Sequence, residues 1–376
     1  MNWRAYSSTQ SGDFLGRWVR NMKIPKLQIG NLTADIPIVQ GGMGVRVSLA
    51  SLASAVANEG GIGTISSIGL GDINVSADDY VQVAREAIVT EIRKAQSMTK
   101  GILAVNFMGV LSNSIDLIKI AIREGIKTIV YGAGLPTKLP AIVPDPDVNL
   151  IPIVSSARVT DLILRSWDKR YTRIPDAFIL EGPLAGGHLG FSTEQLETPE
   201  EYSLEILLPQ ILNAIKPYED KYGRKIPIIA AGGIFNGNDI ARMLSMGASG
   251  VQMGTRFVCT EECDVSAQFK QAYLDAEKED ITIIKSPVGM PGRAIYNAFL
   301  KKLEIKGKLK INCPYKCLTV CKISSARYCI ALALLNSYFG DVDNGLIFCG
   351  QNAYRCKEIT TVKALIQELL TELEAA

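Results

Sequence analysis

The chain contains a single histidine, His188, and it directly follows two glycines in the stretch EGPLAGGHLGF, residues 181–191. The ordinary pKa of histidine allows proton exchange near neutral pH, so a lone histidine at the rim of a cavity is suited to act as a general acid or base. A histidine that only packs or caps is the alternative. Gly186 and Gly187 favour the first interpretation, because they let the loop fold tightly beneath a planar ligand. One histidine excludes a multi-histidine metal site.

Four cysteines form a second candidate group, Cys313, Cys317, Cys321 and Cys329 in CPYKCLTVCKISSARYC. Clustered thiolates often bind zinc or an iron–sulfur cluster. If the segment is one helix, Cys313 and Cys321 stand about 12 Å apart along its axis, too far for one zinc ion. A break near Pro314, or a larger cluster, would relax that limit. Buried structural thiols are the favoured interpretation, so we assign no metal ligands.

Short runs rich in Val and Ile alternate with helical spacing from Ile36 onward. Their nearly continuous apolar character is typical of parallel strands covered on both faces. Eight strands separated by helices predict an α/β fold, a (β/α)₈ TIM barrel, with a doubly wound open sheet as the alternative. The predicted strands cover residues 36–42, 62–66, 102–107, 128–134, 149–156, 177–183, 227–233 and 250–257.

The alternation of predicted strands and helices divides the chain into four predicted parts. Residues 1–21 are a polar N-terminal extension, and residues 22–259 are the barrel. Residues 260–345 are a small, mainly helical excursion or lid that contains the Cys-rich segment. Residues 346–376 return to the barrel and end in an amphipathic helix, as the apolar spacing from Val362 to Leu373 indicates.

Composition and charge bear on whether the protein binds nucleic acid, enters a membrane or is exported. Forty basic and 38 acidic residues leave a net charge of +2, and no basic tract points to nucleic acid. The sequence has no uninterrupted apolar run of 18 residues, so a membrane span is not expected. The polar N-terminus does not resemble an export signal. We therefore expect a cytoplasmic protein with reduced cysteines, no nucleic-acid partner and no membrane association.

Small residues gather where most of the predicted strands end, which is the active-site end of a TIM barrel. AAGGIFNG (230–237) and QMGTRF (252–257) follow strands seven and eight, where such barrels often bind a phosphate. Any one of these glycines could simply turn the chain, but together they favour a phosphate site. The sequence contains neither a GxGxxG motif opening a helix after a strand nor a P-loop.

A set of motifs in the same order resembles the nitronate monooxygenase family, formerly 2-nitropropane dioxygenases, and its relative the FMN-dependent enoyl-acyl carrier protein reductase. The motifs are PIVQGGMG, AGGHLG, IIAAGGI with GASGVQMGTRF, SPVGMPGRAI and CGQNAY. The resemblance runs from about residue 24 to the end of the chain. It implies a barrel that binds FMN without a covalent bond, and it makes a homodimer an expectation.

The resemblance also assigns roles by motif. It implies that Gly42, Met43 and Gly44 lie along the flavin ring and that Asn106 hydrogen-bonds to it. Gly186 and Gly187 would border the substrate. The FMN phosphate would bind at Gly232, Gly233, Gly254 and Thr255, in agreement with the phosphate site inferred from the glycines. His188 would be the catalytic base beside the reactive face of the flavin.

Three functions remain open at this stage. In the favoured one, a nitronate monooxygenase oxidises alkyl nitronates or nitroalkanes with dioxygen to carbonyl compounds and nitrite, with His188 as base. The first alternative is an NAD(P)H-dependent enoyl-acyl carrier protein reductase that uses the same FMN site. The second is a flavin-binding subunit without turnover, against which the presence of His188 argues.

Overall fold

The computed structural model describes residues 24–71, 75–311, 313 and 317–376. The extension predicted over residues 1–21 lies outside them. Eight parallel strands close into a barrel in the order β10-β11-β3-β4-β5-β6-β7-β8. This confirms the predicted (β/α)₈ barrel, and every barrel strand overlaps its predicted run. The strands are β3 (Ile38–Gln40), β4 (Ile62–Ser66), β5 (Ile102–Met108), β6 (Thr128–Gly132), β7 (Asn149–Val154), β8 (Phe178–Glu181), β10 (Ile228–Ala231) and β11 (Gly250–Met253).

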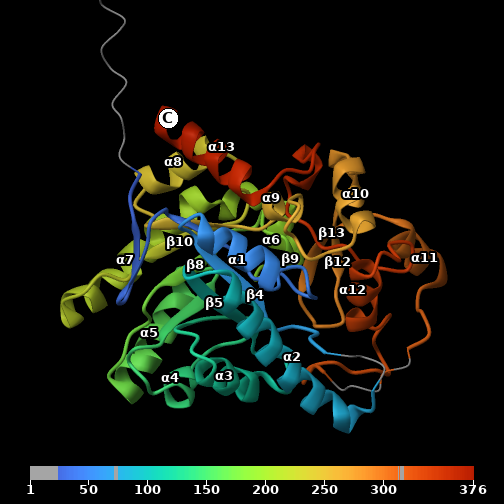
Figure 1. The fold of residues 1–376 in the computed structure, drawn as a ribbon, viewed down its shortest axis with the longest axis horizontal. Helices are drawn as coiled ribbons and strands as arrows, with labels where there is room; N and C mark the ends of the chain where they lie inside the picture. Colours follow the sequence, from blue (N-terminus) through green and yellow to red (C-terminus); the bar gives the residue numbers. More distant parts are fainter. Residues whose placement is uncertain (1–23, 72–74, 312, 314–316) are drawn as a thin grey trace, which may run out of the picture.

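Helices outside the barrel carry the chain from strand to strand (Figure 1). Ser76 caps the longest of them, because its side chain accepts a hydrogen bond from the Asp79 amide at 3.2 Å. The predicted C-terminal helix packs against α8. Apolar side chains such as Leu52, Ile92 and Trp167 fill the layer between strands and helices. The helices are α1 (Ala50–Asn58), α2 (Ala77–Met98), α3 (Ser114–Arg123), α4 (Leu139–Ile142), α5 (Ala157–Tyr171), α6 (Thr193–Glu197), η1 (Pro199–Tyr202), α7 (Leu204–Tyr222), α8 (Gly237–Ser245), α9 (Thr255–Val258) and α13 (Val362–Ala375).

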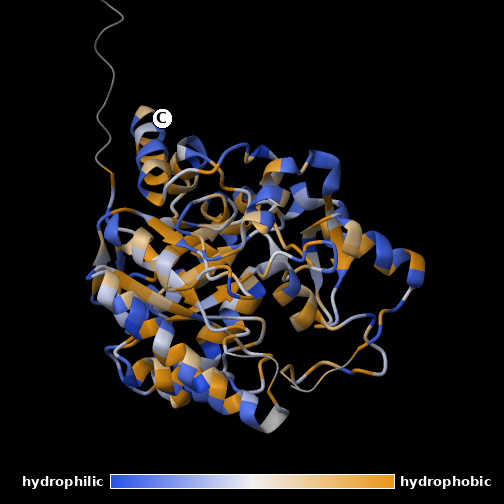
Figure 2. Cartoon of the chain, turned by 45° about the vertical axis from the view of Figure 1, so that its right-hand side comes forward, coloured by the Kyte–Doolittle hydropathy of each residue, from blue (hydrophilic) through white to orange (hydrophobic). Residues whose placement is uncertain are grey.

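A hairpin closes the N-terminal end of the barrel. Its strands β1 (Leu27–Ile29) and β2 (Leu32–Ala34) place Leu27, Ile29 and Ala34 in one buried cluster with side chains from the barrel interior. Hydrophobic colour follows these inner strands in Figure 2, while hydrophilic colour lies mainly on the outer surfaces of the helices. No helix among the described residues is long and apolar enough to cross a membrane.

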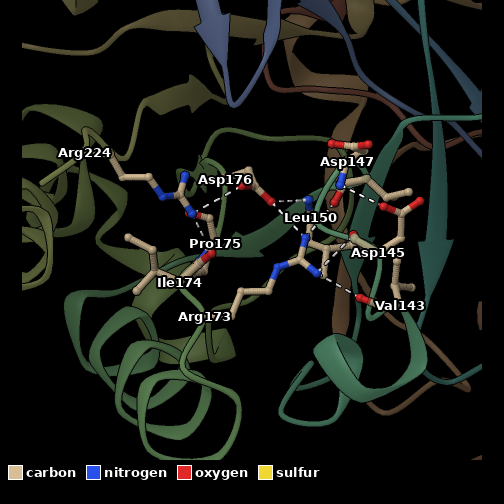
Figure 3. Close-up of polar contacts among 10 residues, drawn as sticks. Val143, Asp145, Asp147, Leu150, Arg173, Ile174, Pro175, Asp176 and Arg224 are labelled. Atoms are coloured by element: carbon tan, nitrogen blue, oxygen red, sulfur yellow. Dashed lines mark hydrogen bonds and ion pairs between the residues drawn. The ribbon is translucent and has the colours of Figure 1, made fainter. Parts of the chain in front are cut away.

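Paired charges complete the same end of the barrel (Figure 3). The Asp176 carboxylate lies 3.4 Å from Arg173 and 3.2 Å from Arg224, and it accepts a 2.9 Å hydrogen bond from the amide of Leu150. Arg173 also donates to the carbonyl oxygens of Val143 and Val148. These contacts tie the starts of β7 and β8 to the neighbouring loops.

After the eighth strand, the chain forms an excursion with a small apolar core of its own, which includes Phe299, Leu300, Tyr328 and Leu346. Its helices lie on one side of the barrel (Figure 1). The sequence predicted a mainly helical segment, and the structure adds a hairpin, β12–β13. β13 also pairs with β9 (Gly187–His188), which ties the excursion to the histidine loop. The elements are α10 (Ala267–Asp275), η2 (Lys278–Asp280), β12 (Ile281–Lys285), β13 (Pro291–Ile295), α11 (Ala298–Lys306), α12 (Ile330–Tyr338) and η3 (Ala353–Arg355).

Candidate active site

The C-terminal ends of the barrel strands surround a cavity of about 480 Å³. Every residue that the sequence analysis proposed for the site lines it, although these residues come from five separate segments of the chain. The structure therefore brings the predicted set together, while the role of each residue stays a prediction. The set is Gly42, Met43, Gly44, Asn106, Gly186, Gly187, His188, Gly232, Gly233, Gly254 and Thr255.

Two of these glycines stand where a side chain would not fit. A Cβ atom on Gly42 would lie 2.3 Å from the Cβ atom of Asn106. Gly232 has a φ of 99°, and a Cβ atom there would lie 2.9 Å from the Ala185 amide nitrogen. Only glycine accepts both the close approach and the positive φ without strain. At Gly42 and Gly232 the cavity wall therefore consists of backbone without a side chain, which suits the close approach of a flat ligand.

Two buried polar atoms in the cavity wall have no hydrogen-bond partner within the described part of the chain. They are Oδ1 of Asn106, whose side chain is 7% exposed, and Oε1 of Gln252. A buried acceptor without a donor costs about 1–3 kcal/mol, so both atoms call for a ligand that donates hydrogen bonds. A flavin ring, which carries donors and acceptors along one edge, meets that demand.

The opposite part of the cavity is formed by the loops after β10 and β11 and by residues 349–352. Thr255, the first residue of α9, accepts a 3.2 Å hydrogen bond from the Gly350 amide through its hydroxyl oxygen. Asn352 donates through its side-chain nitrogen to the carbonyl oxygen of Gly233 at 2.7 Å. The Thr255 hydroxyl hydrogen remains available to donate to an anion here. The glycines predicted to bind a phosphate thus lie together, with the return segment held against them.

His188 is partly buried and is held from two sides. Its Nε2 atom lies 2.7 Å from Oγ of Ser286, and the two rings of His188 and Phe348 meet edge to face at a centroid distance of 4.9 Å. Burial lowers the pKa of His188 to about 4, because the apolar surroundings disfavour the charged imidazolium. The imidazole is consequently neutral at physiological pH and can accept a proton.

The structure adds residues that the sequence analysis missed. Glu181, the last residue of β8, lines the cavity, and burial raises its pKa to about 8 despite the opposing charge of Arg293. Arg293 is 3% exposed and donates to the carbonyl oxygens of Pro183, at 2.7 Å, and Ala185. The sequence offered a signal for Glu181, because a carboxyl side chain at the C-terminal end of a predicted barrel strand is a candidate active-site residue. Ser286 and Arg293 lie in the SPVGMPGRAI motif, but nothing in that motif placed them beside the His188 loop, which is about 100 residues away in the chain.

Comparison with known proteins agrees with this geometry. The model of the nitronate monooxygenase family matches residues 26–372. The chain belongs to the nitronate monooxygenase family. The enzymes of this family are FMN-dependent, which is the cofactor expected from the motifs. The glycine-lined wall and the unpartnered Asn106 and Gln252 oxygens fit that cofactor.

Curated relatives of the chain are named for different activities. The chain is 30% identical over 268 residues, 71% of its length, to a (3aS,4S,5R,7aS)-5-hydroxy-7a-methyl-1-oxo-octahydro-1H-indene-4-carboxyl-CoA dehydrogenase of Mycobacterium tuberculosis, and the match spans 65% of that protein's length. It is 24% identical to a probable nitronate monooxygenase of Staphylococcus saprophyticus, over 75% of this chain and 82% of that one.

Solved structures show the same architecture. FabK from Thermotoga maritima superposes with a TM-score of 0.68 at 26% identity, over 91% of this chain and 93% of that one. A nitroalkane oxidase from Streptomyces ansochromogenes gives the same TM-score at 22% identity, over 91% and 97% of the two chains. The second likeness concerns the fold alone.

Proposed function

We propose that the protein is a nitronate monooxygenase, which oxidises alkyl nitronates or nitroalkanes with dioxygen to carbonyl compounds and nitrite. The observation that carries the proposal is the neutral imidazole of His188 at the rim of a glycine-rich cavity in which the buried Asn106 and Gln252 oxygens lack partners. When bound, FMN supplies the electron transfer. The chain supplies orientation, proton transfer and a suitable electrostatic setting.

His188 removes the α proton of a nitroalkane in this proposal. The C–H bond breaks, an N–H bond forms on the imidazole, and the electron pair stays on the substrate as a nitronate. In the tautomer in which Nε2 donates to Ser286, the Nδ1 lone pair is free to accept that proton. Ser286 keeps the ring oriented, since its hydroxyl oxygen also accepts a 3.2 Å hydrogen bond from the Val288 amide.

Glu181 matters because a nitronate is an anion. With a pKa of about 8, its carboxyl is protonated at neutral pH, so the cavity carries no negative charge at this position to repel the substrate. Gly42, Met43, Gly44 and Asn106 would hold the flavin ring, and Gly232, Gly233, Gly254 and Thr255 would hold its phosphate. Gly186 and Gly187 would border the substrate.

An acyl thioester reaction, such as NAD(P)H-dependent reduction of an enoyl thioester, is the second candidate. The relative named as a carboxyl-CoA dehydrogenase and the FabK structure favour it. A substrate of that kind would use the apolar part of the cavity wall, which includes Leu111, Met290 and Leu334.

Two assays on the purified protein separate the candidates. Stoichiometric nitrite and carbonyl product from a nitronate in air would support the monooxygenase. Anaerobic oxidation of NAD(P)H that depends on crotonyl thioester, without nitrite release from nitronates in air, would replace it by the reductase. A bound flavin that neither a nitronate nor NAD(P)H reduces would contradict both.

A further inference from the structure

Four cysteines surround a second cavity, next to the active site but outside the proposed chemistry. Cys313, Cys317, Cys321 and Cys329 line this cavity, which has a volume of about 390 Å³. Most of the other side chains in its wall are apolar, including Ile311, Leu318, Ile323 and Ile330. Half of the cysteines of the chain are thus concentrated around one apolar space.

A single helix from Cys313 to Cys329 would place the thiols too far apart for one zinc ion, but the described residues of this segment do not form one. The described residues between Cys313 and Cys329 form turns and a bridge instead, and helix α12 begins only at Ile330. The rise per residue of a helix therefore sets no minimum distance between these thiols. The eight-residue spacing of Cys313 and Cys321 in the sequence therefore does not by itself hold their thiols apart.

Backbone contacts fix three of the cysteines from different directions. The carbonyl oxygen of Cys317 accepts a 3.1 Å hydrogen bond from the Ser112 amide, in the loop after β5. A turn closed by the 2.9 Å bond from the Ala326 amide to the Lys322 carbonyl follows Cys321. Cys329 stands at the start of α12, where its carbonyl accepts a bond from the Ala333 amide. The cavity is therefore framed by anchored segments.

The thiols lie within electrostatic reach of one another. Cys329, Cys313 and Cys321 all lie close enough to Cys317 to interact with it electrostatically. Thiolates in such apolar surroundings are stabilised by bound metal cations.

The four thiols line a cavity with room for a group larger than one ion. Four sulfur atoms on a single zinc ion stand about 3.8 Å from one another, given Zn–S bonds of about 2.3 Å. Among the residues that the structure describes, no three His, Cys, Asp or Glu side chains converge closely enough to hold one metal ion. The four thiols face a cavity instead of a point, and four cysteine thiolates are the usual ligands of a cubane cluster.

We propose that Cys313, Cys317, Cys321 and Cys329 bind an iron–sulfur cluster of the [4Fe–4S] class. Its site shares a wall with the active-site cavity, because Cys317, Leu318 and Ile330 line both. The cluster would thus lie next to the cavity that would hold the flavin. This inference does not depend on the proposed reaction, since cluster binding is measured without any substrate.

The test is metal and sulfide analysis of the full-length protein, purified anaerobically and reconstituted with ferrous iron and sulfide. We expect about four iron and four acid-labile sulfide atoms per chain, and an electron paramagnetic resonance signal after reduction with dithionite. Cys317→Ser and Cys321→Ser should each lower the retained iron at least fivefold. Cys263→Ala should retain it, because Cys263 is a buried thiol outside the cavity.

A second measurement covers the case in which a variant fails to fold. In the native wild-type protein, the cluster should protect the four cysteines from alkylation by iodoacetamide, and chelation of iron should expose them to it. Iron without stoichiometric sulfide, zinc in place of iron, or full iron content in the Cys317→Ser/Cys321→Ser double variant would overturn the proposal.

Discussion

The two ends of the barrel differ in where their buried polar groups lie. At the N-terminal end, the Asp176 carboxylate has two arginine partners and a backbone amide, and the β1–β2 hairpin covers the interior. At the C-terminal end, buried oxygens of Asn106 and Gln252 have no partner in the described chain. Unpartnered atoms also occur at the N-terminal end, Oγ1 of Thr128 and Nδ2 of Asn149, but they do not line a ligand cavity, whereas Asn106 and Gln252 do.

The difference separates residues that stabilise the fold from those that serve the chemistry. Both ends use the same strands, so the barrel itself does not distinguish them. What differs is the residue type at each strand end: paired charges at one end, and glycine with single polar side chains at the other. Changes at the first end should alter stability, and changes at the second should alter ligand binding.

The largest effect on stability is expected at the N-terminal end. Asp176→Ala leaves Arg173 and Arg224 without their shared partner and should lower the free energy of unfolding by about 3–5 kcal/mol. FMN affinity of the folded fraction should not change. Urea unfolding and flavin titration measure the two quantities. The matched control is Asp147→Ala, an exposed carboxyl in the same region (Figure 3), which should change stability by no more than about 0.5 kcal/mol.

At the C-terminal end, Gly42→Ala should act mainly on the cofactor. The added methyl group would displace Asn106, and the dissociation constant of FMN should rise roughly tenfold to a hundredfold. Gly223→Asn is the control, because Gly223 has a positive φ that asparagine tolerates and lies in open space after α7. Unchanged FMN binding in the Gly42 variant would show that the glycine wall is not the flavin site.

The smallest effect concerns pH. The Glu181 carboxyl is protonated below its raised pKa of about 8, so repulsion of an anionic nitronate should appear only as the pH rises through that value. We expect KM for a nitronate to increase a few-fold between about pH 7 and pH 9. Glu181→Gln should remove the increase, and an identical pH profile in that variant would exclude Glu181 as its source.

Local patterns in the sequence predicted one part of this structure well. Apolar runs located all eight barrel strands, and Val362 to Leu373 marked the final helix. The eighth strand ends before its predicted limit because Gly254 turns the chain into α9. Glycines at strand ends, together with the family motifs, located the cavity.

Long-range contacts could not be predicted in the same way. β9 has only two residues, too few for a recognisable strand pattern, yet its pairing with β13 places Arg293 beside Gly187. Ser286 and Phe348 reach His188 from distant segments. Their positions depend on the packing of the excursion, which has no repeating pattern in the sequence.

The central claim is that His188 acts as a base beside a flavin at the C-terminal end of the barrel. Anaerobic reduction of the bound flavin by a neutral nitroalkane and by its preformed nitronate, in the wild type and in His188→Asn, tests it directly. The account predicts a loss of at least about a hundredfold with the nitroalkane, little change with the nitronate, and retained FMN. Equal rates in the two proteins, or equal losses with both substrates, would contradict it.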